Sequence, residues 1–383
     1  MIRPDGRASS AWHVRCDGSG VVNLYEGLEL NDRLRLVRPL AEGGMANLWV
    51  AWHGVLGMEV AVKILDSKAA KEVTAKQRLL REARLTDRVA GPHVVRILDR
   101  QESRAEDGSP FLVMELLEGE DLATRIARRG RLSIDETCTV VQHMSLALES
   151  AHRIGVIHRD VKPANVFLVE TKEGTIAKLV DFGIAKDASE PTAGLTRADA
   201  LMGTPPFMSP EQVTGARDVD LRCDVWSLAV VAYSCLTGKN PFDGATFGAI
   251  CVAIHLGRFD PPSFERPELP AALDAFFAKA LSTSIELRYQ SARALCAAFR
   301  EATWSDAGVE TEDGSSSVSD AARADEAFSS ARTLLVLDDI GEVLDPPTLV
   351  PDNVPFELAR PRSGTRTIDS IRVSSTAGRR GRG

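Results

Sequence analysis

The pattern of hydrophobic and polar positions divides the chain into a strand-rich part and a helical part that follows it. Short alternating or apolar runs separated by Gly and Asn are typical of twisted strands joined by turns. These runs cover residues 34–50, 59–65, 94–98 and 111–117, and a charged stretch over residues 69–89 favours a helix between them. After Gly119 apolar residues recur at helical spacing, which predicts helices over residues 122–129, 134–154, 224–237, 247–257, 271–281 and 291–302. We therefore expect two lobes with a crevice between them, where ligand sites are common.

The two ends of the chain lack this periodicity. Residues 1–30 mix Gly, Ser and Asp with isolated apolar residues, which indicates an irregular leader. Residues 303–383 hold no Lys and few aromatic residues, so most of this tail is expected to be disordered. Its charge is polarised, because residues 301–357 contain 14 acidic residues and 2 arginines, whereas residues 358–383 contain 1 acidic residue and 7 arginines.

Net charge and cysteine spacing argue against several functions. The 383 residues include 46 Lys and Arg against 54 Asp and Glu, a net charge of −8, which gives no general electrostatic reason to bind nucleic acid or an anionic membrane. The 6 cysteines form no C-x-x-C pair and suggest free thiols in a reducing compartment. The N-terminus lacks the apolar core of a signal peptide, and the longest apolar run, residues 225–236, is too short to cross a bilayer. We therefore expect a cytoplasmic protein without a membrane partner.

A lysine embedded in an apolar strand is the first chemical candidate. Lys63 ends the motif V-A-V-K, and a half-buried ammonium group needs an anionic partner. Two candidates are Glu82, on the helix that follows, and a nucleotide phosphate. The small-residue turn over residues 40–48 can lay backbone N–H groups over phosphate oxygens, although ordinary hairpin turns share this composition.

A polar loop with charges of both signs is the second candidate. H-R-D-V-K-P-A-N occupies residues 158–165 between apolar runs, and D-F-G follows at residues 181–183. Phosphoryl transfer needs a carboxylate to orient and deprotonate the acceptor hydroxyl, oxygen ligands for Mg²⁺, and a cation near the migrating phosphoryl group. The loop and Asp181 supply all three.

In this order the motifs resemble those of a eukaryotic-like (Hanks-type) serine/threonine protein kinase of the kind found in bacteria. V-A-V-K, H-R-D-V-K-P-A-N, D-F-G, G-T-P-P-F-M-S-P-E and D-V-W-S-L follow one another within residues 34–300. The resemblance implies an α+β, bilobal protein-kinase fold with a small β-rich N-lobe containing one main helix, a larger helical C-lobe and a disordered tail. It sets the kinase domain at residues 31–302, with the N-lobe at 31–114, the hinge at 115–120 and the C-lobe at 121–302.

The resemblance also implies roles for individual residues. Asp160 is expected to be the catalytic base, and Lys162 to steady the γ-phosphate and the acceptor. A lysine at that position is similar to Ser/Thr-directed members of the family. Glu211 is expected to pair with Arg288, and Asp224 to hold the backbone of the catalytic loop.

A site for ATP and Mg²⁺ is implied as well. Asn165 and Asp181 resemble the Mg²⁺ ligands, and Lys63, held by Glu82, resembles the contact to the α- and β-phosphates. Met114 falls at the gatekeeper position, before the hinge whose backbone binds adenine. Four apolar residues are expected to line the adenine ring as its walls, although residues of these types also occur in an ordinary hydrophobic core. The residues expected to contact ATP are Leu40, Ala41, Glu42, Gly43, Gly44, Met45, Ala46, Asn47, Leu48, Ala61, Lys63, Met114, Glu115, Leu117 and Phe167, of which Leu40, Leu48, Ala61 and Phe167 are the walls.

The segment between Asp181 and Glu211 resembles an activation loop. Arg159, beside the expected base, needs a counter-charge that a phosphorylated loop residue can supply. Thr196 is the expected site of autophosphorylation, with Thr192 and Ser189 as alternatives, and Thr204 lies in the segment expected to dock the substrate.

The glycine-rich loop departs from G-x-G-x-x-G, because Ala41 and Ala46 replace the first and third glycines. A methyl group there is expected to hold the backbone off the phosphates or to restrict positive φ, and so to weaken ATP affinity. Three functions stay open: a Ser/Thr protein kinase, a pseudokinase acting as a nucleotide-binding scaffold, and a small-molecule phosphotransferase. The long activation segment favours protein substrates, with a transient homodimer for autophosphorylation.

Overall fold

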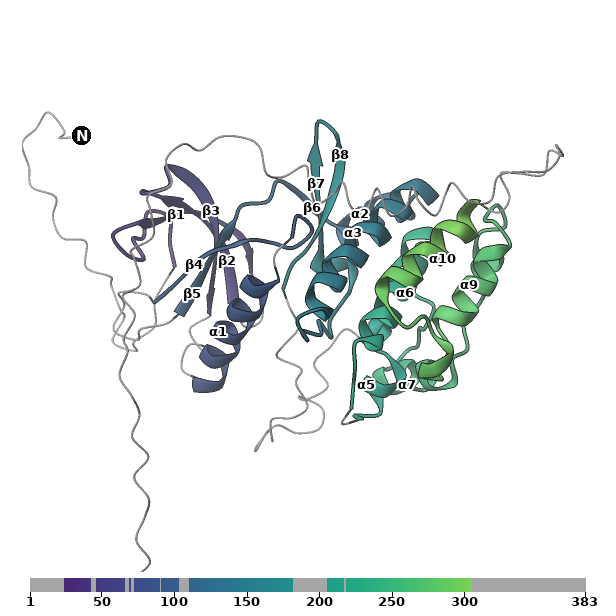
Figure 1. Cartoon of the computed structure of the whole chain (residues 1–383). Coiled ribbons are helices and arrows are strands. Elements are labelled where there is room, and N and C mark those ends of the chain that lie inside the picture. The colour runs from purple at the N-terminus through teal and green to yellow at the C-terminus, as the bar shows by residue number, and fades with distance from the viewer. Residues whose placement is uncertain are drawn as a thin grey trace, which may run out of the picture. The chain divides into compact units, whose positions relative to one another are not determined.

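The computed structural model describes residues 24–42, 46–65, 69, 72–89, 91–102, 110–181, 205–216 and 218–304 (Figure 1). These residues all belong to the first of two compact units, Met1–Thr311. Most of the expected leader and nearly all of the expected disordered tail lie outside the described residues. Within the described part of the chain, no helix is both long enough and apolar enough to cross a membrane.

An antiparallel sheet of five strands, in the order β1-β2-β3-β5-β4, forms the first lobe. Its strands are β1 (Leu34–Glu42), β2 (Ala46–His53), β3 (Met58–Leu65), β4 (Ile97–Glu102) and β5 (Pro110–Glu115). Successive side chains of a strand point to opposite faces. In β3, Val60 and Val62 therefore join the core on one face, whereas Ala61 belongs to a different cluster. Lys63 shares the parity of Ala61, so β3 directs it away from the core of the first face.

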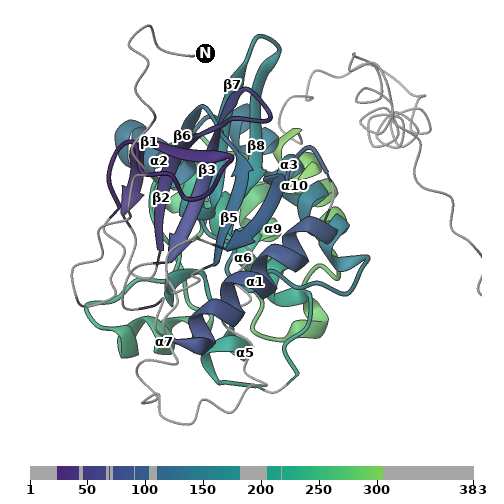
Figure 2. The same ribbon diagram turned by 90° about the vertical axis from the view of Figure 1, so that its left-hand side faces the viewer.

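The helix α1 (Val73–Arg88) packs beside this sheet (Figure 2). Its buried residues Ala75, Leu79 and Ala83 are four positions apart, so they line one side of the helix and pack with Leu65 and Leu112. This packing fixes the rotation of α1 about its axis, and with it the direction of Glu82.

Two boundaries of the sheet differ from the sequence-based expectation. Leu28 and Leu30 are buried against the sheet, so packed structure begins before residue 31. The strand predicted over residues 94–98 begins only at Ile97, because Val94 pairs instead with Leu179, which belongs to another sheet.

That second sheet joins β6 (Gly119–Asp121), β7 (Val166–Thr171) and β8 (Gly174–Leu179). The helical spacing does not predict it, because its strands are short and flank the polar motifs. Gly119 is required where β6 meets β7: its φ is +152°, and a Cβ atom there would lie 1.9 Å from the backbone oxygen of Leu168.

The remaining elements are helical. The capping box of Ser133 and Glu136 starts α3, and the continuous burial from Cys223 to Leu236 makes α6 the centre of this lobe's core. Every predicted helix is present, with ends shifted by no more than two residues except at the start of α1, which begins four residues after the predicted residue 69, and the α+β fold is confirmed. The helices are α2 (Leu122–Arg129), α3 (Ile134–His152), α5 (Pro210–Val213), α6 (Arg222–Thr237), α7 (Phe247–Leu256), α8 (Pro262–Glu265), α9 (Ala272–Ala280) and α10 (Ala292–Trp304), with the 3₁₀ turns η2 (Pro163–Asn165), η4 (Pro205–Phe207) and η5 (Ile285–Leu287).

Candidate active site

Lys63 connects β3 to two carboxylates from distant parts of the chain. Its Nζ atom lies 2.9 Å from Glu82 Oε1 on α1 and 2.8 Å from Asp181 Oδ1, which follows β8. Lys63 and Asp181 are 118 positions apart in the sequence. The partner that the sequence suggests for Lys63, Glu82, is therefore within hydrogen-bond distance, and Asp181 adds a second negative charge.

Burial and charge act against each other in this group. Burial lowers the pKa of Lys63, but the carboxylates of Asp181 and Glu82 outweigh it and hold that pKa above its usual value. Burial raises the pKa of Glu82. Burial also acts to raise the pKa of Asp181, but the charge and hydrogen bond of Lys63 outweigh it and hold that pKa below its usual range. At neutral pH the ammonium is therefore charged, and Asp181 is the carboxylate that stays ionised as the pH falls.

The loop over residues 158–165 gathers three more polar side chains. Lys162 Nζ donates to Asp160 Oδ2 at 2.8 Å. Asn165 Nδ2 donates to the Asp160 backbone oxygen at 2.9 Å and to its Oδ2 at 3.2 Å, which turns the amide oxygen of Asn165 to the opposite side. The 3₁₀ turn η2, with Pro163 in its first turn, sets this spacing. The Asp160 carboxylate is thus held between an ammonium and an amide group.

Asp224, in the first turn of α6, is fully buried and binds the backbone of this loop. Its carboxylate accepts hydrogen bonds from the backbone N–H groups of His158 at 2.8 Å and Arg159 at 2.7 Å, and from His152 Nε2 at 2.8 Å. Burial raises the pKa of Asp224, but these donors outweigh burial and keep that pKa below its usual range. The expected role of Asp224 in holding the loop matches this geometry.

Backbone strain coincides with the site. Arg159, with a φ of 64°, and Asp181, with a φ of 55°, are the non-glycine residues with positive φ in the described part of the chain. Asp224 fixes the first of them. Near the second, the backbone N–H of Val180 donates to the carbonyl of Asn165 at 2.9 Å. That bond brings the two expected metal ligands, Asn165 and Asp181, to neighbouring positions.

Apolar residues lie next to Lys63 on its side of β3. Ala61, Met114 and Val95 are buried in one cluster, and Leu48 and Leu117 pack against it. The side chains expected at the gatekeeper, the hinge and two adenine walls are therefore grouped together.

The other two expected walls are placed differently. Leu40, near the end of β1, is 39% exposed. Phe167 is half-buried on β7, and its ring lies near Gly119. Neither belongs to the described cluster around Met114.

The hairpin of β1 and β2 holds the expected phosphate-binding turn. Glu42 pairs with Asn47 at its base, and the turn residues Gly43, Gly44 and Met45 lie outside the described residues. Ala41 and Ala46 are both in extended strands and do not have positive φ. The expectation that they restrict a positive-φ conformation is therefore wrong, and the expected weaker ATP affinity then rests only on crowding of the phosphates.

Glu211 and Arg288 form the ion pair expected from the sequence. Two hydrogen bonds of 2.8 Å join their side chains in a buried, bidentate contact, and the guanidinium group also lies over the ring of Trp226. The remaining expectations for the activation segment, namely Thr196, its alternatives Thr192 and Ser189, and Thr204, lie outside the described residues, as do Phe182 and Gly183.

A further ion pair at the hinge was not predicted. Glu115 Oε1 lies 2.7 Å from Lys178 Nζ on β8 and accepts a hydrogen bond from the backbone N–H of Arg96 at 2.8 Å. No motif signals this contact, because its three members come from separate segments. It ties the start of the hinge to the strand that leads to Asp181.

A model of the protein kinase domain matches residues 34–297 of the chain. The chain belongs to the protein kinase family. This kinase domain is 37% identical over 267 residues to the serine/threonine-protein kinase PknH of Mycobacterium tuberculosis, a match covering 70% of this chain and 41% of the relative. It is also 37% identical over 308 residues to the serine/threonine-protein kinase Pkn1 of Myxococcus xanthus, which covers 79% of this chain and 42% of that relative.

The fold of this kinase domain agrees with a solved structure. The crystal structure of the Mycobacterium tuberculosis PknI kinase domain matches with a TM-score of 0.57 and 29% identity, over 73% of this chain and 100% of that one. The resemblance to bacterial Hanks-type kinases and the bilobal fold are therefore confirmed. The matches span about two fifths of the length of the two curated relatives.

Proposed function

We propose that the chain is a serine/threonine protein kinase that transfers the γ-phosphate of ATP to Ser or Thr hydroxyl groups of proteins. The 2.8 Å contact between Lys63 and Asp181 supports this most strongly, because it brings a phosphate-binding cation beside a metal-binding carboxylate. The relatives named above as serine/threonine-protein kinases share the expected chemistry. We also propose a cytoplasmic location, which the free thiols of the described cysteines support.

Asp160 acts as the base in this proposal. The hydrogen bonds from Lys162 and Asn165 fix the orientation of its carboxylate, so an acceptor hydroxyl meets it without further side-chain ordering. Lys162 then serves both groups: it orients Asp160 and offers its charge to the phosphoryl group as that group moves toward the acceptor.

Asn165 and Asp181 suit Mg²⁺, which prefers oxygen ligands and few protein carboxylates. The amide oxygen of Asn165 faces away from Asp160, and Asp181 stays ionised beside Lys63. A bound Mg²⁺ would neutralise charge on the phosphate oxygens. The cluster of Ala61, Met114, Leu48 and Leu117 supplies an apolar surface suited to adenine.

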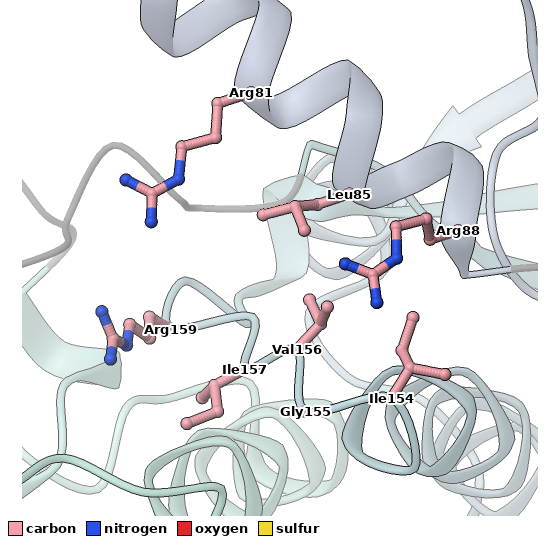
Figure 3. Close-up of a pocket in the computed structure, with 8 residues that line it drawn as sticks. All are labelled: Arg81, Leu85, Arg88, Ile154, Gly155, Val156, Ile157 and Arg159. Atoms are coloured by element: carbon pink, nitrogen blue, oxygen red, sulfur yellow. The ribbon is translucent and has the colours of Figure 1, made fainter. Parts of the chain in front are cut away.

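A basic pocket supports the proposal that the kinase is activated by phosphorylation of Thr196. Figure 3 shows Arg81 and Arg88 extending from α1 toward residues 154–159, with Arg159 at the opposite side. The pocket has a volume of about 210 Å³. A phosphate group there would bring negative charge between arginines of α1 and of the catalytic loop. Autophosphorylation would proceed in a transient homodimer.

The test is to incubate the full chain with labelled ATP and Mg²⁺, together with generic protein substrates and, separately, small-molecule acceptors. We expect phosphoserine and phosphothreonine on protein and no phosphotyrosine. ATP binding without transfer would instead identify a nucleotide-binding scaffold, and label on small molecules alone would identify a small-molecule phosphotransferase.

A further inference from the structure

Two histidines from different segments form a stacked pair beside β8, the strand that leads to Asp181. The rings of His93, which precedes β4, and His143 on α3 have centroids 4.0 Å apart and an interplanar angle of 18°. His93 is buried and His143 is half-buried. Neither takes part in the proposed transfer reaction.

The pair binds both backbone polar groups of one β8 residue, Ala177. The backbone N–H of Ala177 donates to His143 Nδ1 at 3.1 Å, so this nitrogen must be unprotonated. His93 Nδ1 lies 3.1 Å from the carbonyl oxygen of Ala177, so it must carry the proton and donate. These bonds fix both neutral tautomers, and a proton added to His143 Nδ1 would break the first bond.

Ala177 lies next to the point where residues 93–95 attach to β8. The backbone N–H of Leu179 donates to the carbonyl of His93 at 2.8 Å, and that of Val95 donates to the carbonyl of Leu179 at 3.0 Å. α3 also packs along β8 (Figure 1). β8 then continues directly to Asp181, so its position determines where that carboxylate lies.

The surroundings oppose protonation of either ring. Burial lowers the pKa of His93, the hydrogen bond to the Ala177 carbonyl opposes this, and the nearby charge of Lys178 adds to the decrease. Burial also lowers the pKa of His143 to about 4, and the adjacent His93 adds to the decrease. Lys178 is itself paired with Glu115. Because both pKa values lie below the unfolded value of about 6.5, this contribution to stability is complete above pH 6.5 and is lost as the pH falls below it.

We propose that His93 and His143 are positioning residues that hold β8, and through it Asp181, and that they do so fully only while His143 is neutral. The catalytic consequence rests on the proposed kinase function. Acidic pH therefore weakens the attachment of β8 by protonating His143, without any change in the protonation of the catalytic groups.

Hydrogen exchange in the full chain tests the attachment without any assay of activity. After correction for the intrinsic exchange rate, opening of the amides in residues 174–181 should increase about ten-fold from pH 7.5 to pH 5.5, the factor expected for a pKa of about 4 in the folded chain and 6.5 in the unfolded chain. The variant carrying His93→Asn and His143→Asn keeps a donor and an acceptor near Ala177 but cannot be protonated, so its opening should change much less. His255→Asn, at an exposed histidine of α7, is the control and should behave like the wild type.

Kinetics test the positioning role at pH 7.5. His143→Ala removes the acceptor and should lower kcat about ten-fold or more, whereas His143→Asn should restore it to near the wild-type value. Equal kcat values for His143→Ala and wild type would overturn the proposal, and so would acid opening in the double Asn variant that matches wild type. The exchange result does not depend on phosphate transfer, so failure of the proposed function would be recognised separately.

Discussion

At the scale of single residues, the site depends on buried groups that touch no substrate. Asp224 accepts hydrogen bonds from His152 and from two backbone N–H groups of the catalytic loop. One of those groups belongs to Arg159, whose φ of 64° is costly without such support. The position of the neighbouring Asp160 therefore depends on the buried carboxylate of Asp224.

Asp224→Asn should destabilise the chain and slow catalysis together. The amide presents an N–H group where a carboxylate oxygen accepted, so at least one buried donor loses its partner, at a cost of about 3 kcal/mol. Urea unfolding and kcat measure the two effects. Asp135→Asn, at an exposed residue in the first turn of α3, is the matched control and should change either value little. A wild-type kcat in folded Asp224→Asn would contradict this account of the loop.

At the scale of elements, the buried pair of Glu211 and Arg288 joins α5 to the segment before α10. Arg288 is fully buried, donates to Glu211 twice and also donates to the carbonyl of Ser282 at 2.7 Å. Arg288→Ala should lower the free energy of unfolding by about 3–5 kcal/mol, because it leaves a buried carboxylate without its partner.

A matched surface pair separates burial from charge. Arg131 and Glu268 lie 3.2 Å apart, and each is about half exposed. Arg131→Ala should cost less than about 1 kcal/mol. Chemical denaturation of both variants gives the comparison, and equal losses would show that burial does not determine the strength of the Arg288 contact.

The end of α6 is fixed by a glycine that the helix–loop geometry requires. Gly238 has a φ of +75°, and a Cβ atom there would lie 2.0 Å from the backbone oxygen of Gly130. Gly238→Ala should destabilise the chain by more than about 2 kcal/mol, because a positive-φ cost of about 1 kcal/mol adds to the clash. Gly130→Ala, with a φ of +78° and no atom within 4 Å of the added Cβ, should show the backbone cost alone in the same thermal unfolding experiment.

Elements with a strong period were predicted well, and short ones were not. The helices over residues 122–129, 134–154 and 224–237 match the structure closely, since each spans two or more turns with recurring apolar positions. β6, β7 and β8 were missed because they are short and flank the polar motifs, which obscure their pattern. The start of β4 was misplaced because Val94 pairs with β8, a contact that local sequence does not encode.

At the scale of the whole molecule, the site is assembled from segments that are far apart in the sequence. Each of these segments carries its own recognisable motif. Lys63, Asp160 and Asp181 could be selected from the sequence because each lies in a recognisable motif. The Glu115–Lys178 pair and the stack of His93 on His143 could not, because their residue types are ordinary and only the fold brings them together. The expected catalytic residues can therefore be identified from sequence motifs, whereas the contacts that support them can be identified only in the folded chain.

The most direct test of the central claim is the rate of phosphate transfer from labelled ATP by wild type and Asp160→Asn, with Mg²⁺ and with the metal removed by a chelator. We expect transfer by wild type that depends on Mg²⁺, and a loss of at least about 100-fold in Asp160→Asn, because the base is replaced by a neutral amide. The variant should keep the thermal stabilisation by ATP and Mg²⁺, which shows that its binding site is intact. Transfer at the wild-type rate by Asp160→Asn would contradict the assignment of this loop as the catalytic centre.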